Sequence, residues 1–219
     1  MRSTAQKRRV SARARREGPG SYDRQASSEQ RRAEQRARLL AAANAVFARD
    51  GYARASVDAI VERARMSRRT FYEHFNDISD IFLHVYDQAA SVLLRVVDSA
   101  IRQKKDPVEK LEAGVVAYLQ TFQQNADIAR VIHREIRAAG PAHALRHELA
   151  VMRFASLLSE GVVEAYARGS ATRAPTETTV YALVAGLEAV GVRYVDRGEE
   201  SRIMEAAPEL IELVLRAFR

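Results

Sequence analysis

Apolar residues recur at helical spacing along most of the chain, and no alternating strand pattern of useful length appears. The pattern predicts an all-α protein of about nine helices. Their expected ranges are 28–50, 57–64, 68–75, 78–104, 107–124, 126–138, 142–168, 176–195 and 201–218. Glycine ends the first of them at Gly51, Gly140 and Pro141 separate the sixth from the seventh, and a polar loop at 169–175 follows the seventh.

The segment from Ser56 to Phe75 carries two short helical patterns on either side of a tight polar break. Ser56 is placed to cap the first helix and Ser67 to cap the second. The apolar positions of the two are Val57, Ile60, Val61 and Ala64, then Phe71 and Phe75. Two helices joined by about 3–4 residues form a helix-turn-helix, whose second helix can enter the major groove of DNA.

The first turn of that second helix would face base edges, and it holds Arg68, Arg69 and Thr70. Arginine can bond guanine bidentately, and threonine can use its hydroxyl or contact the thymine methyl group. Outside such a motif an arginine pair more often belongs to a solvated helix face. Glu73 leaves two alternatives open, because its carboxylate can accept from cytosine or bond an arginine of its own helix.

Composition narrows the class of protein further. The 219 residues are 47% hydrophobic and include no cysteine, which excludes disulfides, thiolate nucleophiles and zinc–thiolate sites and fits a reducing cytoplasm. No apolar run approaches the roughly 18 residues of a membrane span, and the basic N-terminus lacks the apolar stretch of a secretory signal. The formal net charge of +7 lies mainly on residues 1–28, which hold eight basic and two acidic side chains.

Residues 1–27 lack apolar periodicity and are expected to form a disordered basic arm, either a phosphate tether or a solvated tail. Residues 28–82 are expected to form the helix-turn-helix domain. Residues 83–219 are nearly neutral, which suits a core and a partner surface more than a groove for a polyanion.

Residues 38–82 resemble the TetR family of bacterial transcriptional regulators. The segment from Arg38 to Ala64, with the run from Phe47 to Tyr52, is similar to that family's first two helices. MetSerArgArgThrPheTyrGluHisPhe at 66–75 is similar to its turn and recognition helix. The resemblance implies phosphate contacts by Ser56, Ser67 and Tyr72, while His74 could touch a phosphate or a base.

Three positions depart from the family pattern. Arg65 stands where the family usually has glycine, and in a left-handed conformation a side chain there costs on the order of 1 kcal/mol. Two explanations stay open: the turn differs slightly from the family's, or the arginine is kept for a phosphate. Val61 replaces a small alanine, and Ile78 stands where the family often has a phosphate-binding lysine. That lysine contact cannot be carried over to this chain.

The resemblance also implies a homodimer built on the last two helices, an inverted-repeat operator in duplex DNA and a small-molecule effector. A small-residue face of the eighth helix and an apolar stripe of the ninth are the expected interface; the alternative is packing within one chain. These residues are Ala182, Ala185, Gly186 and Ala189, and Leu210, Ile211, Val214, Leu215 and Phe218.

An effector pocket is expected among the middle helices, although ordinary core packing is the alternative for each candidate residue. The candidates are Tyr86, Tyr118, Phe122, His133, Met152, Phe154 and Tyr181. His143 and His147 are four residues apart, as metal-binding pairs are, but such a pair is more often a solvated or locally bonded surface feature. Neither a metal nor a cofactor is predicted.

The predicted function is that of a transcriptional regulator, most often a repressor, that an effector releases from its operator. Two other functions are less consistent with the sequence. A helical enzyme is disfavoured because no nucleotide-binding glycine loop, zinc-protease motif or ordered catalytic triad appears. A non-specific nucleic-acid binder is supported by the basic arm alone. The two binding functions differ in sequence preference, since a specific regulator prefers its site by about 10³-fold or more.

Overall fold

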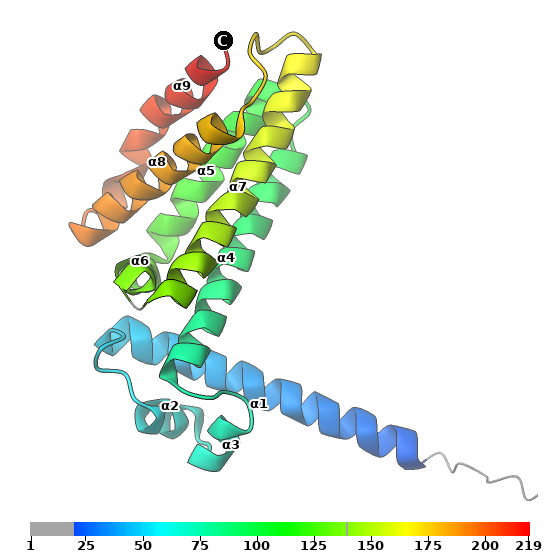
Figure 1. Cartoon of the computed structure of the whole chain (residues 1–219), viewed down its shortest axis with the longest axis vertical. Coiled ribbons are helices and arrows are strands. Elements are labelled where there is room, and N and C mark those ends of the chain that lie inside the picture. Colours follow the sequence, from blue (N-terminus) through cyan, green and yellow to red (C-terminus); the bar gives the residue numbers. More distant parts are fainter. Residues whose placement is uncertain (1–19, 139) are drawn as a thin grey trace, which may run out of the picture. The chain divides into compact units, whose positions relative to one another are not determined.

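The computed structural model describes residues 20–138 and 140–219, and the side chains of residues 20–26, 137 and 138 lie outside that description. All regular structure in the described residues is helical, which confirms the predicted all-α class (Figure 1). The chain divides into two compact units, residues 1–37 and residues 38–219. Nearly all of the described fold belongs to the second unit.

The helices follow the order expected from the sequence. They are α1 Gly20–Asp50, α2 Val57–Ala64, α3 Arg68–Tyr72, α4 Ile78–Arg102, α5 Pro107–Gln124, α6 Ala126–Ala138, α7 Pro141–Ala167, α8 Glu177–Asp196, the 3₁₀ helix η1 Glu200–Ala206, and α9 Ala207–Ala217. The predicted ninth helix is therefore divided, with η1 occupying its first part.

Helix α1 begins at Gly20, earlier than the Ser28 start that apolar periodicity indicates. Residues 27–34 are exposed and all except Ala33 are polar, so no apolar stripe marks the helix there. Glutamine, glutamate and arginine are good helix formers nonetheless, and Gln30 donates to Glu34 one turn on, at 3.4 Å. The predicted disordered arm is thus wrong for residues 20–27, and residues 1–19 lie outside the described part of the chain.

Capping side chains account for where several helices start. Asp77 accepts from the Asp80 N–H at 2.8 Å, Asp106 from the Val108 N–H at 2.9 Å, and Thr176 from the Thr179 N–H at 3.2 Å. Proline occupies the first turn of α5, α7 and α9, where its missing N–H has no partner to lose.

Two hydrophobic clusters form the core, and α4 contributes to both. The N-terminal cluster joins α1, α2 and α3 to Ile81, Phe82, Val85 and Tyr86 of α4, and it also takes in Ile132 and Ile136 of α6. The C-terminal cluster packs α5, α7, α8, η1 and α9 together with Val97, in the second half of α4. One continuous helix therefore connects the helix-turn-helix to the C-terminal core.

Gly191 of α8 allows this helix to pack tightly against α5 in the C-terminal core. A Cβ there would lie 2.9 Å from the Phe122 ring of α5. That ring is held between Tyr118, at a centroid distance of 5.1 Å, and His133, at 5.2 Å, so it cannot move aside freely.

We predict that Gly191→Ala lowers the free energy of unfolding by about 1–3 kcal/mol, because overpacking outweighs the gain in helix propensity. Denaturant unfolding followed by circular dichroism measures the change. In a Phe122→Leu background the same substitution should be less costly. An equal cost in both backgrounds would show that the ring is not what excludes a side chain at this position.

Candidate DNA-binding surface and ligand pocket

Two serine caps fix the geometry of the helix-turn-helix. The Ser56 hydroxyl accepts from the Ala59 N–H at 3.2 Å, and the Ser67 hydroxyl accepts from the Thr70 N–H at 3.0 Å. Both caps were predicted from the sequence and are confirmed. Because capping oxygens satisfy N–H groups that a helix start leaves unpaired, they define where α2 and α3 begin.

The turn between the two helices is closed by backbone hydrogen bonds. Met66 N–H donates to the Val61 carbonyl at 2.9 Å and Arg65 N–H to the Glu62 carbonyl at 3.1 Å, the pair that defines a Schellman motif. Arg65 has φ 53° and ψ 50°, in the left-handed region, as the comparison with glycine at this position anticipated. From α1, the Arg38 guanidinium donates to the Ala64 carbonyl at 2.7 Å and holds the end of α2.

The inner face of α3 is part of the N-terminal core. Phe71 is fully buried and Phe75 nearly so, and their ring centroids lie 5.8 Å apart, which confirms their predicted core role. Helix α3 ends at Tyr72, before the predicted limit of Phe75. Anchoring through Phe71 leaves the opposite face of this short helix toward solvent.

Arg68 and Arg69 lie on that outer face, with side chains that are 61% and 89% exposed. Arg68 lies 3.3 Å from Asp58, and Tyr72 and Asp58 raise its pKa further above the ordinary range. Arg69 donates to Glu73 at 3.1 Å, so of the two alternatives for Glu73 the structure contains the bond within the helix. Ion pairs this exposed are screened by solvent and contribute little, so both guanidinium groups can be released to another partner.

The remaining DNA-contact candidates differ in how much surface they offer. Tyr72 is 53% exposed, while Thr70 and His74 are half-buried. The Thr70 hydroxyl lies 2.9 Å from that of Ser67, so both are engaged in the cap. Exposed side chains of Ser56, Ser67, Arg68, Arg69 and Tyr72 are therefore gathered at the start of α2 and along α3.

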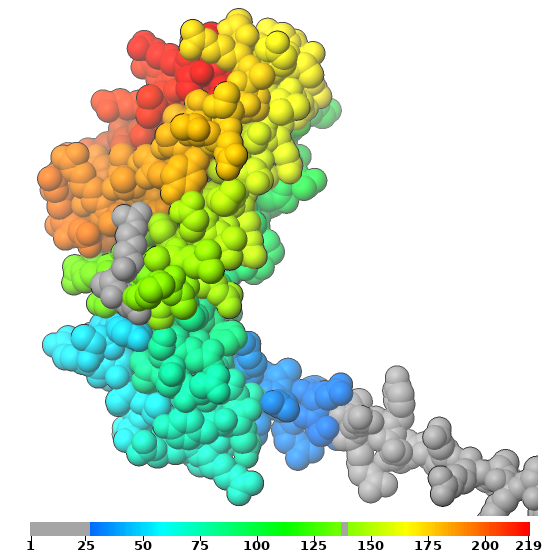
Figure 2. Space-filling model, viewed as in Figure 1, coloured from blue at the N-terminus to red at the C-terminus, as the bar shows by residue number. Residues whose placement is uncertain are grey.

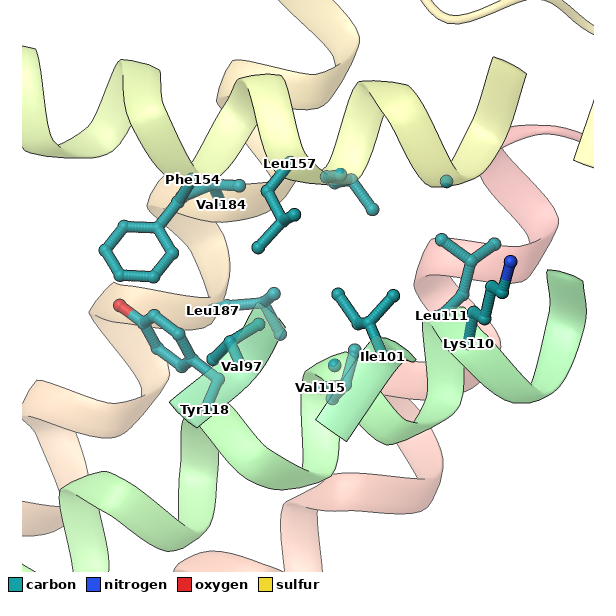
Figure 3. Close-up of a pocket in the computed structure, with 13 residues that line it drawn as sticks. Val97, Ile101, Lys110, Leu111, Val115, Tyr118, Phe154, Leu157, Val184 and Leu187 are labelled. Carbon is teal, nitrogen blue, oxygen red and sulfur yellow. The ribbon is translucent and has the colours of Figure 1, made fainter. Parts of the chain in front are cut away.

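A cavity opens between α4, α5, α7 and α8 in the C-terminal core (Figure 3). The empty space between these helices amounts to about 520 Å³, including the part that is open to solvent. Most of the wall is aliphatic. The lining residues are Val97, Ile101, Lys110, Leu111, Gly114, Val115, Tyr118, Phe154, Leu157, Leu158, Gly161, Val184 and Leu187.

Of the pocket candidates named from the sequence, Tyr118 and Phe154 line this cavity. The other candidates do not line it. Met152 and Tyr181 are exposed, with the Tyr181 hydroxyl donating to Glu148 at 3.0 Å, and Phe122 is buried against Gly191. Helical periodicity identifies a buried face, but it does not say which buried residues border a void.

Tyr86 and His133 instead belong to a polar cluster around the buried carboxyl group of Glu188, on α8. His133 Nδ1 and His147 Nε2 lie 3.0 and 3.3 Å from Glu188 Oε1, and the Tyr86 hydroxyl lies 3.2 Å from His147 Nδ1. These side chains come from α4, α6, α7 and α8. The cluster therefore links four helices beside the cavity.

His143 and His147 have separate partners. His143 is buried, lies 3.3 Å from the Ser79 hydroxyl, and has its pKa lowered by desolvation. The pair is locally bonded, as one alternative held, but it is not a surface feature. Within the described residues, no group of three or more histidine, aspartate or glutamate side chains is arranged to hold a metal ion.

The small-residue face of α8 is open to solvent in the single chain. Ala182 and Ala189 are exposed, Ala185 and Gly186 are half-buried, and a Cβ added at Gly186 would meet nothing within 4 Å. On α9 the expected stripe is divided, and Leu210, Val214 and Phe218 are buried in the chain's own core, which is the packing that the alternative described. The outward apolar residues are the 52% exposed Leu213 and the half-buried Ile211 and Leu215.

Among the lining residues that sequence reasoning missed, Lys110 is the charged one, and a signal for it was present. Lys110, Gly114 and Tyr118 recur every four residues, so they share one face of α5. A lysine and a glycine among the apolar residues of one helix face indicate that this face does not simply pack against a neighbouring helix.

The structure thus combines a capped helix-turn-helix, which carries an exposed arginine pair, with an all-α domain that contains an apolar cavity. One helix, α4, joins the two, which is the arrangement of a DNA-binding module connected to a pocket. Family models agree with this class. The model described as "Bacterial regulatory proteins, tetR family" matches residues 39–85, and the one described as "Tetracyclin repressor-like, C-terminal domain" matches residues 104–218. The chain belongs to the tetR family of bacterial regulatory proteins.

Individual relatives agree with this membership. The chain is 30% identical over 119 residues to the HTH-type transcriptional activator FasR of Mycolicibacterium smegmatis, and the match spans 54% of each chain, about half of that curated relative. The fold is similar to that of the fatty acid degradation regulator FadR from Bacillus halodurans, with a TM-score of 0.73, 21% identity, and 83% of this chain and 98% of that chain covered. FadR from Bacillus subtilis, solved in complex with stearoyl-CoA, gives a TM-score of 0.73 at 16% identity with the same coverage.

We predict that Arg65→Gly raises the free energy of unfolding by about 0.5–1 kcal/mol, because glycine adopts the left-handed region without steric cost. If the arginine also touches a phosphate, the same change weakens DNA binding and makes the slope of log K against log salt less steep by about 0.9. Denaturant unfolding and salt-dependent binding to duplex DNA measure the two effects.

Arg65→Asn is the matched control, since asparagine tolerates the left-handed region but carries no charge. It should reproduce the change in DNA binding with a smaller gain in stability. A glycine variant no more stable than the parent would contradict strain at this turn.

Proposed function

We propose that the protein is a dimeric, sequence-specific transcriptional repressor that leaves an inverted-repeat operator when an effector with an acyl or alkyl chain fills its cavity. The observation that carries the proposal is the exposed Arg68–Arg69 pair on a capped recognition helix. The Phe71 anchor supports it, because it directs the first turn of α3 away from the core and toward a groove.

A dimer is needed because one short recognition helix buries too little surface for strong specificity. Two copies bring their α3 helices to successive major grooves, about 34 Å apart, and so read an inverted repeat. We propose that the open face of α8, together with exposed apolar side chains of α9, is the surface that pairs with a second copy. In Figure 2 the orange and red surfaces of α8 and α9 lie next to each other.

The chemistry of the cavity supports an aliphatic effector. Its wall combines leucine, isoleucine and valine side chains with two polar groups, Lys110 and Tyr118. A long hydrocarbon chain gains about 0.8 kcal/mol for each CH₂ group that such a wall removes from water. Stearoyl-CoA bound to the similarly folded FadR of Bacillus subtilis supports the same class.

Helix α4 is the proposed link between effector and DNA. Val97 and Ile101 line the cavity, while Ile81, Phe82 and Val85 on the same helix pack in the N-terminal core beside α3. An effector that fits better when α4 has shifted will favour dimers whose recognition helices are wrongly spaced. Only that difference in affinity between the two states can release DNA.

Activation is a second candidate, because FasR is named as a transcriptional activator. DNA fragments selected by the purified protein from sheared chromosomal DNA, used as templates for transcription in vitro, distinguish the two functions. Repression predicts fewer transcripts when protein is added and recovery with effector; activation predicts more transcripts. Selection of no preferred sequence would contradict both.

We predict that Arg69→Ala costs about 1–3 kcal/mol on the selected operator and relaxes preference at one base pair of each half-site. Binding to random-sequence DNA should change little. Arg69→Lys is the matched control, because it keeps the charge but loses the bidentate geometry, so its specificity should also fall. Quantitative binding to single-base operator variants measures this; equal affinities of parent and alanine variant for all of them would contradict base contact by Arg69.

We predict that Gly186→Leu weakens the dimer by at least about 1 kcal/mol through overpacking across the interface, while the single chain remains folded because the added atoms enter open space. Sedimentation equilibrium at several concentrations measures the dissociation constant. Gly186→Ala should have a smaller effect of the same kind. An unchanged dimer constant in the leucine variant would place the interface elsewhere.

A further inference from the structure

The cavity is chemically different at its two ends, and the difference indicates how an effector lies in it. Lys110, on α5, is the one charged side chain among the described lining residues, and it stands at one end beside Leu111. Tyr118 and Phe154 stand at the other end (Figure 3). We propose that Lys110 is the head-group site of the pocket and that the effector is an aliphatic carboxylate whose anionic end bonds the Lys110 ammonium. This inference rests on the proposed aliphatic effector and adds its head group and its direction.

The Tyr118 end is unsuited to an anion. Its phenol is buried, and burial together with the nearby negative charge of Glu188 raises its pKa well above the usual value. A second negative charge placed there would face the Glu188 carboxyl group in a medium that screens charges poorly. The hydrocarbon tail therefore belongs at this end, against the Tyr118 and Phe154 rings.

The Lys110 end already contains an ion pair that a ligand can enter. Lys110 Nζ lies 2.5 Å from Glu164 Oε2, and Glu164 Oε1 lies 2.6 Å from the Arg168 guanidinium. Two cations thus share one carboxylate, so this group of three side chains has a net charge of +1. A ligand carboxylate that takes Lys110 leaves Glu164 paired with Arg168, and the enlarged group becomes neutral.

Burial makes this exchange specific for a charged head. The Lys110 side chain is 18% exposed, which reaches solvent but screens the ammonium only in part. An uncharged head that displaced Glu164 would leave a largely buried cation unpaired, and removing one partner of such a pair is strongly unfavourable. A carboxylate restores the pairing, whereas an amide or an alcohol does not.

The same exchange alters a contact between helices. The Lys110–Glu164 bond joins α5 to α7, and the Arg168 guanidinium also donates to the Lys105 carbonyl at 3.2 Å, in the loop that follows α4. A head group that replaces Glu164 on Lys110 therefore acts where α5, α7 and the end of α4 are held together. Effector binding and movement of α4 become linked through one ion pair.

The experiment compares decanoate, decanamide and decanoyl-CoA as probes, with affinities measured by isothermal titration calorimetry on the full-length chain. The acid and the amide have nearly the same shape and differ in charge. We expect the parent protein to bind decanoate about 10–100-fold more tightly than decanamide, the range that a hydrogen bond to a charged group supplies.

Lys110→Gln should weaken decanoate binding by a similar factor and leave decanamide unchanged, and Lys110→Arg should retain the preference for the acid. Lys104→Gln, which removes the same charge from an exposed neighbour outside the cavity, should have little effect. Glu164→Gln should strengthen decanoate binding, since it removes the competing anion, a result that a purely structural role for Glu164 does not produce. Thermal unfolding of each variant establishes that it is folded.

The outcomes separate the inference from the proposed function. If the parent binds none of the three probes, the aliphatic effector itself is wrong. If acid and amide bind equally, or if Lys110→Gln leaves decanoate affinity unchanged, the head-group assignment is wrong while the aliphatic effector stands. Tight binding of decanoyl-CoA without binding of decanoate also overturns the carboxylate assignment and keeps the acyl chain.

Discussion

Helix α4 belongs to two hydrophobic clusters at once, and the rest of the molecule depends on this constraint. Its first turns supply Ile81 and Phe82 to the core that supports α3, and its second half supplies Val97 to the core around the cavity. At 1.5 Å per residue the helix is roughly 37 Å long. Because close-packed interiors do not deform continuously, a displacement imposed at one end of such a rod is carried to the other.

The N-terminal core also includes Ile132 and Ile136 of α6. The helix-turn-helix is therefore held to the C-terminal helices by side-chain packing as well as by the continuous chain of α4.

The Glu188 cluster complements this apolar connection. A carboxyl group buried on α8 is costly unless it is paired, and His133 and His147 provide partners from α6 and α7 while Tyr86 ties His147 to α4. Polar contacts of this kind are directional, so they define one arrangement of the four helices where hydrophobic packing alone would accept several. Glu188 is close enough to Tyr118 to affect its pKa, so the cluster lies near the Tyr118 end of the cavity. The Lys110–Glu164 pair lies at the other end, so polar contacts between helices stand near both ends.

Local sequence signals predicted the helix-turn-helix well, because its geometry is set by nearby residues. Ser56 and Ser67 cap as expected, Phe71 and Phe75 are buried, and Arg65 occupies the left-handed position that the glycine comparison indicated. Periodicity failed where its physical basis was missing: the first turns of α1 have no apolar face, and on α9 a stripe of apolar residues could not reveal whether its own chain or a partner covers it. The cavity was the least predictable feature, since a void arises from how four helices meet, and Tyr118 and Phe154 carry no mark that distinguishes them from Phe122.

These observations together constrain how an effector can act. A ligand confined to the apolar wall would add burial energy in any arrangement that keeps the cavity, and equal gains in two states shift no equilibrium. A head group that competes with Glu164 for Lys110 behaves differently, because it removes a contact between α5 and α7 as it binds. The hydrocarbon tail of the ligand then supplies affinity, and its head group supplies the difference in affinity between the two conformational states. The Arg168 guanidinium, which shares Glu164 with Lys110, contacts the Lys105 carbonyl next to the end of α4. A change in the Lys110–Glu164 ion pair can therefore affect α4, the helix that supports the DNA-binding surface.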